Sequence, residues 1–124
     1  MKRLVLICGL VLAVLPSAAQ TAGAMGEPRI AALQIALHAR GLYGGTIDGL
    51  WGPATATSVR RLQQRAGISV TGAAGARTRR ALGDYGRPAV GRRELRVGDL
   101  GWDVSVTQFR LAWHGFPSGP MDGM

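Results

Sequence analysis

A glycine-rich phrase that recurs along this chain constrains its fold more than any other feature. It reads I-D-G-L-W-G-P-A-T over residues 47–55, and it returns over residues 70–78 with Thr71 in the place of Asp48. A fragment at residues 120–124 begins the phrase a third time. Glycines at fixed positions permit turns that other residues avoid, and each full phrase is followed by a sequence that suits a helix. Two similar loops, each leading into a helix, predict a small pseudo-symmetric domain with a ligand site near the loops.

The start of the chain has the organisation of an export signal. A basic start is followed by an apolar run at residues 4–15 and then by small residues up to Ala19. This order is typical of a secretory signal peptide, and the apolar run is shorter than the roughly 20 residues that a membrane-spanning helix needs. We therefore expect a signal peptide over residues 1–19, cleaved after Ala19 or at Ala24, with no stable membrane insertion afterwards.

Charge and cysteine content narrow the function classes. The formal net charge is +8, and the only cysteine, Cys8, lies within the predicted signal peptide. A mature protein without a thiol has neither a disulfide nor a cysteine metal site, and depends on its packed core. A basic surface attracts an anionic polymer. Export argues against nucleic acid as that polymer and favours the bacterial cell wall, so we expect a secreted or cell-envelope protein.

Residues 28–83 carry the pattern of three helices joined by the two glycine-rich loops. Apolar residues recur at helical spacing within residues 28–41 and 53–67, and a short third helix is expected over residues 76–82. The expected buried faces comprise Ile30, Leu33 and Leu37 on the first helix, and Thr55, Val59, Leu62 and Ala66 on the second. We predict an all-α fold, a small three-helix bundle with two Gly-rich loops, preceded by a flexible N-terminus at residues 20–27.

The same unit begins again at residues 94–124, after a predicted linker at residues 84–93. The correspondence pairs Gln34 with Gln108 and keeps a constant spacing to the end of the chain. This second copy stops before its second helix, and such a half-copy cannot close a core alone. The chain is therefore either a fragment of a longer protein, or its tail is ordered by packing elsewhere. We expect four aromatic residues of the half-copy to be partly exposed: Trp102, Phe109, Trp113 and Phe116.

One spaced series of residues is specific in combination. It comprises Leu33-Gln34, Leu37, Gly41, Gly45, Asp48-Gly49, Gly52, Thr55, Val59 and Leu62-Gln63. The series resembles the peptidoglycan-binding domain 1 family, over residues 29–83 nearly completely and over residues 103–124 as a truncated second copy. That family is a compact three-helix module usually attached to cell-wall hydrolases. The resemblance implies a noncatalytic module whose partners are peptidoglycan and a wall hydrolase.

The chain departs from the family pattern at three positions. Leu62 stands where the family often has Phe, which is a core exchange of little functional weight. Thr107 stands where the first copy has Leu33, which weakens the core face of the second copy. Thr71 replaces the Asp that is common in the second loop, so we expect that loop to be held less firmly.

Seven residues around the loops are the candidates for ligand binding: Tyr43, Asp48, Gly49, Trp51, Gly52, Thr55 and Arg77. Asp48 and Thr55 also suit a structural role, in which the carboxylate accepts backbone N–H bonds in an Asx turn and the hydroxyl bonds nearby loop groups. In the alternative, the loop presents backbone N–H groups to a ligand carboxylate. The rings of Tyr43 and Trp51 either pack over the core or contact sugars and peptide stems.

Arginines gather on the third predicted helix. Arg77, Arg79 and Arg80 form either a solvated face or a clamp for a carboxylate, since guanidinium binds carboxylates through two hydrogen bonds. The histidines, His38 and His114, occupy different positions in the two copies and do not make a zinc ligand set. No nucleophile, general base or paired carboxylates stand in a catalytic arrangement. We expect no catalytic residue, no metal and no cofactor here.

Together these features predict an exported module that concentrates an attached or partner wall enzyme on peptidoglycan. Two alternatives stay open at this point. In one, the chain is the N-terminal part of a cell-wall hydrolase whose catalytic domain lies beyond Met124. In the other, the chain has a structural role and its apolar tail docks on a protein partner.

Overall fold

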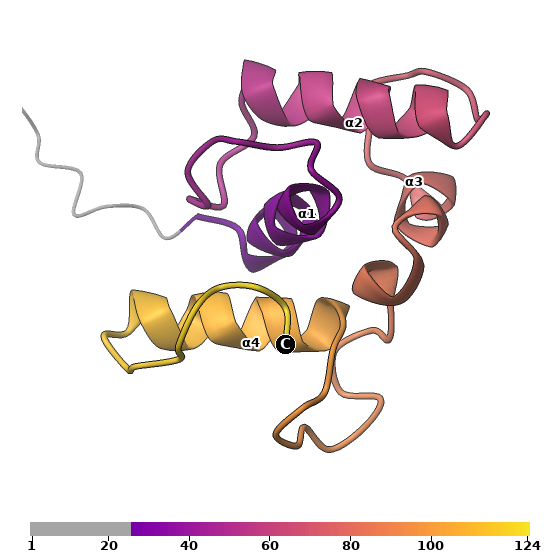
Figure 1. Ribbon diagram of the computed structural model, residues 1–124. Helices are drawn as coiled ribbons and strands as arrows, with labels where there is room; N and C mark the ends of the chain where they lie inside the picture. Colours follow the sequence, from indigo (N-terminus) through magenta and orange to yellow (C-terminus); the bar gives the residue numbers. More distant parts are fainter. Residues whose placement is uncertain (1–25) are drawn as a thin grey trace, which may run out of the picture.

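The computed structural model describes residues 26–124. The predicted signal peptide, its cleavage sites and most of the predicted flexible N-terminus lie outside the described residues. Figure 1 shows the arrangement of the elements. In chain order they are α1 (Pro28–Ala39), α2 (Pro53–Arg65), α3 (Ala76–Ala81), the 3₁₀ helix η1 (Gly83–Gly86) and α4 (Trp102–Trp113). The described residues contain helices and no strand, which confirms the predicted all-α class.

Proline and glycine set the limits of the first two helices as predicted. Pro28 and Pro53 occupy the first turns of α1 and α2. Backbone N–H groups in the first turn have no partner within the helix, so the N–H that proline lacks is not needed there. Gly41 and Gly67 follow the helix ends with φ of +67° and +65°. Glycine adopts this left-handed conformation without the steric cost that a Cβ adds, so each helix ends in a tight reversal.

Helix α1 is buried on every side over residues 31–37, although the sequence indicated a single apolar face. The reason is that α1 lies between α2 and α4 (Figure 1), and that its packing against α4 is the most extensive between any two elements. A helix that is covered on opposite sides needs small or apolar residues all round. The alanines of α1 meet this need because they allow close approach: Ala31, Ala32 and Ala36.

The core therefore includes residues from the predicted half-copy. Trp102 and Val106 of α4 belong to the same buried cluster as Leu33, Leu37 and Leu82 of the first unit. Trp102 is only 5% exposed and Phe109 is also buried, so the expectation that these two aromatic residues are partly exposed was wrong. They are covered because the half-copy packs on α1. The expectation is confirmed for Trp113 and Phe116, which lie at or beyond the end of α4.

On α2, the buried face is shifted from the predicted one. Thr55, Val59 and Leu62 are buried as expected, but Ala66 is exposed at the C-cap position. Ser58 and Gln63 are buried instead. The Ser58 hydroxyl donates to the Leu42 carbonyl at 2.7 Å, which attaches the middle of α2 to the loop after α1.

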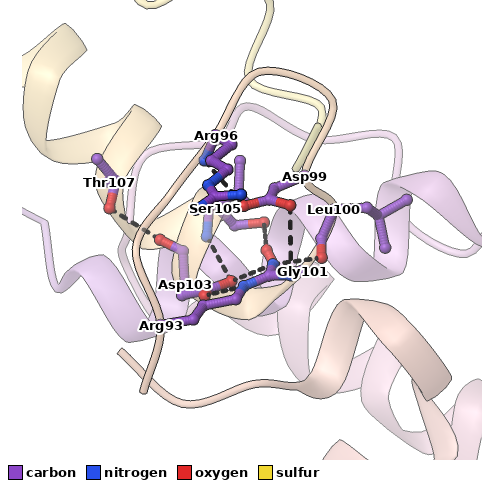
Figure 2. A network of polar contacts seen from close by, with 9 residues as sticks. Arg93, Arg96, Asp99, Leu100, Gly101, Asp103, Ser105 and Thr107 are labelled. Atoms are coloured by element: carbon purple, nitrogen blue, oxygen red, sulfur yellow. Dashed lines mark hydrogen bonds and ion pairs between the residues drawn. The ribbon is translucent and has the colours of Figure 1, made fainter. Parts of the chain in front are cut away.

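The start of α4 is fixed by a polar network that Figure 2 shows from close by. Asp103, nearly fully buried, accepts hydrogen bonds from Arg93 Nε at 2.9 Å and Arg93 Nη2 at 3.2 Å. Arg93 also donates to the Leu100 carbonyl at 2.9 Å. The Asp103 carboxylate raises the pKa of Arg93 above its ordinary value by this hydrogen bonding. The network therefore joins the loop before α4 to the first turn of that helix, next to Trp102.

The segment predicted as a linker at residues 84–93 begins inside η1. Tyr85 packs, partly buried, against the hydrophobic core. A Cβ built on Gly123 would stand 3.1 Å from the Tyr85 ring, so η1 also lies against the C-terminal turn. No helix within residues 26–124 has the length and apolar character to cross a membrane.

Candidate ligand-binding site

A buried glutamine on α1 holds the first glycine-rich loop. Gln34 is fully buried, and its Oε1 accepts hydrogen bonds from the backbone N–H groups of Asp48 at 3.1 Å and Gly49 at 3.0 Å. Its Nε2 lies within hydrogen-bonding distance of four acceptors, and the two shortest contacts are Asp48 Oδ1 at 2.9 Å and the Leu50 carbonyl at 3.0 Å. The other two are Tyr43 Oη at 3.2 Å and Thr55 Oγ1 at 3.3 Å. A carboxamide has two N–H donors, so these four contacts share them.

Asp48 completes the turn from within the loop. Its Oδ1 accepts the Leu50 N–H at 2.8 Å, which confirms the predicted Asx turn. The hydrogen bond from Gln34, and then the one from Leu50, lower the pKa of Asp48 below its ordinary value because both favour the charged form. The N–H groups of residues 48, 49 and 50 are thus all satisfied inside the protein, and the carboxylate is held ionised.

The second loop has the same construction around Gln63 of α2. The Gln63 Oε1 accepts from the N–H groups of Thr71 at 3.0 Å and Gly72 at 2.9 Å. Its Nε2 donates to the Ala73 carbonyl at 2.9 Å, to Thr78 Oγ1 at 3.0 Å and to Thr71 Oγ1 at 3.2 Å. Thr71 therefore takes the bonds that Asp48 takes in the first loop. Its hydroxyl accepts the Ala73 N–H at 3.2 Å, a longer bond than its counterpart in the first loop.

The C-terminal turn repeats the arrangement around Gln108 of α4. Gln108 Oε1 accepts the Gly123 N–H at 2.9 Å, and Nε2 donates to Asp122 Oδ1 at 3.1 Å and to the Met124 carbonyl at 2.8 Å. The Met124 N–H and Gln108 lower the pKa of Asp122, in that order of size. The bond from Glu27 N to the Gly49 carbonyl also has a counterpart, from Gly101 N to the Gly123 carbonyl.

Five of the seven predicted ligand-binding residues meet at or beside the first loop as part of its own framework. Tyr43 is buried and donates to the Thr46 carbonyl at 2.7 Å. Asp48, Gly49 and Thr55 contact Gln34, and Gly52 forms the N-cap of α2. Whether any of these residues also contacts a ligand stays a prediction.

Trp51 is different, because this residue is 44% exposed. It lines a pocket of about 290 Å³ between the two loops, the N-terminal end of α1 and the start of α4. The pocket is lined by Glu27, Arg29, Ile30, Leu33, Trp51, Ala74, Arg79 and Trp102. Trp51 comes from the first loop and Ala74 from the second. The predicted neighbourhood of a site, near both loops, thus contains a pocket.

Arg77 lies apart from this pocket. It is exposed on α3 and lines a separate groove with Ala66, Ile68, Arg80 and Ala81. Arg79, two residues further along, faces the other way. Its guanidinium carbon lies over the Trp102 ring at 5.0 Å from the ring centre, which is a cation–π contact. Of the predicted arginine cluster, the pocket includes Arg79 alone.

Sequence reasoning did not assign a role to the three glutamines. The sequence does hold a signal for them, since Gln34, Gln63 and Gln108 each stand on a helix before an [Asp/Thr]-Gly pair. A glutamine on the buried side of a helix needs polar partners, and the recurring loop supplies them. Trp102 was missed as a pocket residue because the sequence left open that the tail packs elsewhere but did not identify α1 as its partner.

The first three helices and both full loops carry the family match. Residues 26–82 match the family model described as a putative peptidoglycan binding domain. Residues 26–82 belong to this family. The match ends at residue 82 and does not extend to residues 94–124. Comparisons of the chain with curated proteins and with solved structures find no match.

The pocket is therefore formed jointly by the peptidoglycan-binding domain and by Trp102, which lies outside it. Within residues 26–124, no three His, Cys, Asp or Glu side chains gather in a way that could hold a metal ion. What the pocket offers chemically is two indole rings, two guanidinium groups and one carboxylate. These groups suit noncovalent binding of a polar ligand with an apolar side.

Proposed function

We propose that this chain is an exported, noncatalytic module that binds peptidoglycan and so concentrates an attached or partner wall enzyme at the wall. The family membership of residues 26–82 carries the proposal. The pocket beside Trp51 supports it, because it lies where two hydrogen-bonded loops meet. Restricting a bound enzyme to the wall raises its effective concentration there without any new catalytic contact.

A sedimentation assay with insoluble peptidoglycan tests this function. We expect the purified protein to sediment with the polymer at low salt. We expect Trp51→Ala to lower the retained fraction, since it removes an exposed ring from the pocket. Trp113→Ala is the matched control. Trp113 is similarly exposed, at 42%, but it lies at the C-terminal end of α4, whereas the pocket is at the N-terminal end of that helix. Protein that stays wholly in the supernatant at low salt contradicts the function.

The domain organisation enters the same proposal. Residues 1–19 act as a signal peptide, residues 28–83 bind the wall, and residues 84–93 connect to a second repeat at residues 94–124. Mass spectrometry of the protein recovered from the cell envelope tests the first part. We expect a mature N-terminus at residue 20 or 25, and an uncleaved N-terminus contradicts export by this signal.

A second candidate function rests on the exposed face of α4. Leu37 and Leu42 of the first unit are buried in the core that α2 completes, whereas their counterparts Leu111 and Phe116 are exposed. Leu111 lines a groove of about 350 Å³ with Leu95, Val97 and Met124. Since α2 covers Leu37 and Leu42 in the first unit, the groove beside Leu111 suits an amphipathic helix with an apolar face like that of α2. A peptide of residues 52–68 is the probe, and unchanged binding by a Leu111→Ser variant contradicts this candidate.

A third possibility concerns a longer parent protein. A catalytic domain encoded beyond Met124 would make this chain the wall-binding part of a hydrolase. The downstream coding sequence tests it directly, and a stop codon immediately after Met124 rules it out.

A further inference from the structure

The pocket shared by the peptidoglycan-binding domain and α4 has the chemistry of a carboxylate site. We infer that it binds a free carboxylate of the peptide stem in peptidoglycan, with Arg79 as the recognising group and Trp51 beside it. This inference rests on the proposed function and specifies which part of the polymer is held. Four observations on the pocket lead to it.

First, Arg79 is oriented but its donors are unused. Its Cζ lies over the Trp102 ring, 5.0 Å from the centroid, and within residues 26–124 its side chain makes no hydrogen bond or ion pair. A guanidinium that lies over a ring still has N–H groups along its planar edge, and these stay available to a ligand. Such an edge matches the two oxygens of a carboxylate, and little further side-chain ordering is needed on binding.

Second, the ring below Arg79 is fixed. Trp102 is 5% exposed and belongs to the hydrophobic core. The next residue, Asp103, is held by the two hydrogen bonds from Arg93 (Figure 2). Trp102 also donates its backbone N–H to the Arg87 carbonyl at 3.3 Å. The platform on which Arg79 stacks is therefore held by the core on one side and by polar contacts on the other.

Third, Trp51 is presented by a fixed loop. The residue before it, Leu50, has its N–H bonded to Asp48 and its carbonyl bonded to Gln34. With both backbone groups of Leu50 satisfied, the backbone that carries Trp51 is fixed, while Trp51 stays 44% exposed. An exposed tryptophan on a fixed backbone offers a large apolar contact area with only two side-chain torsions to order on binding.

Fourth, charge and size select the ligand. Two arginines, Arg29 and Arg79, and one carboxylate, Glu27, line the pocket, so its net charge favours an anion. A volume of about 290 Å³ holds about ten water molecules at their liquid volume, which suits one or two small amino acids. A stem peptide combines small apolar side chains with carboxylates. A neutral sugar offers Arg79 hydroxyl acceptors, but it lacks the opposite charge and the paired oxygens that make a carboxylate the stronger partner.

The test compares the affinities of two variants, each lacking one arginine charge, for two soluble ligands. The soluble probe is an N-acetylmuramyl tripeptide with free carboxylates, and its control is the same compound with the carboxylates converted to amides. Binding is followed by Trp fluorescence and by isothermal titration. Arg79→Gln removes the proposed contact, and Arg77→Gln removes the same charge from the same helix at a separate groove. Circular dichroism and thermal unfolding show whether each variant keeps its fold.

We expect wild-type protein and Arg77→Gln to bind the free tripeptide with affinities within about twofold of each other. We expect Arg79→Gln to bind it about tenfold or more weakly, the loss typical of one charge-assisted pair. The amidated probe should bind the wild type as weakly as the free probe binds Arg79→Gln. Should Arg79→Gln lose its fold, Arg79→Lys serves instead, because it keeps the charge and lacks the planar edge.

The failures are distinguishable. If intact sacculi retain the wild type and Arg79→Gln equally well, or if the amidated probe binds as tightly as the free one, the carboxylate site is wrong while wall binding stands. If sacculi do not retain the wild-type protein at all, both the proposed function and this inference are overturned.

Discussion

Replacing Gln34 by leucine tests whether one carboxamide holds the first loop. Leucine has a similar size and keeps the helix, so the change removes polar contacts and little else. The N–H groups of Asp48 and Gly49 lose their shared acceptor, and the Leu50 carbonyl loses its donor. Gly49 is buried and Asp48 is half-buried, so water can reach only part of what is left unpaired.

The size of the effect follows from these unpaired groups. A buried donor left without an acceptor costs about 1–3 kcal/mol, and two of them, one partly hydrated, give about 2–4 kcal/mol. A domain of this size is stable by about 5–15 kcal/mol, so the loss is a large part of the total. It corresponds to a fall in Tm of about 10–25 °C.

Urea unfolding followed by circular dichroism measures this loss. Gln64→Leu is the matched control, because Gln64 is exposed on α2 and its side chain makes no hydrogen bond within the described part of the chain. We expect the control to change the free energy of unfolding by less than about 0.5 kcal/mol. A Gln34→Leu variant as stable as Gln64→Leu would refute the role of the carboxamide.

Three further predictions concern the same loops. Hydrogen bonds hold the folded-state pKa of Asp48 below the unfolded value of about 3.9. The contribution of Asp48 to the free energy of unfolding is therefore complete above that value, and it is lost as the pH falls through the lower folded-state pKa. Measured against pH in the acid range, the stability of Asp48→Asn should fall less steeply than that of the wild type. Gly49→Ala should lower the Tm more than Gly41→Ala. Both glycines have positive φ, so a Cβ at either position costs about 1–2 kcal/mol of stability. Only at Gly49 would the added atom also stand 2.7 Å from the backbone of Gly26. Gln108→Leu should speed amide hydrogen exchange at Gly123, whose N–H it leaves without an acceptor, and unchanged exchange there contradicts the proposed role of that glutamine.

The sequence was sufficient for the first three helices and their ends. Proline at the first turns, glycine after the last turns and the apolar spacing between them act locally, and the structure places α1, α2 and α3 within a residue or two of their predicted limits. The 3₁₀ helix η1 was not predicted, because it lies mostly in the segment interpreted as a linker. The family was also recognisable, because the spacing of its glycines and polar residues is specific.

The packing of α4 on α1 could not be predicted in the same way. Periodicity shows that a helix has an apolar face, but it does not identify the partner of that face. The alanines of α1 gave a hint, because Ala31 and Ala32 widen the apolar stripe beyond what a three-helix unit needs. Without this contact, Trp102 was assigned to an exposed tail and the pocket lacked its platform for Arg79.

The glutamines show a related limit. The spacing includes Gln34 and Gln63, but it favours Asp48 and Thr55 as the residues that form the loop, because carboxylates and hydroxyls commonly bond to loop backbone. The structure places the carboxamide at the centre and these residues around it. A buried amide gives no charge signal in a sequence, so its role becomes apparent only when the partners are in view.

An uncharged carboxamide at the centre of each loop makes the shape of the loop insensitive to salt. Dissolved ions screen attraction between separate charges over about 10 Å at 0.1 M, but they act weakly on short hydrogen bonds from a buried amide. A change in ionic strength should therefore alter the attraction between this basic chain and an anionic polymer, while the conformation of the loops stays the same.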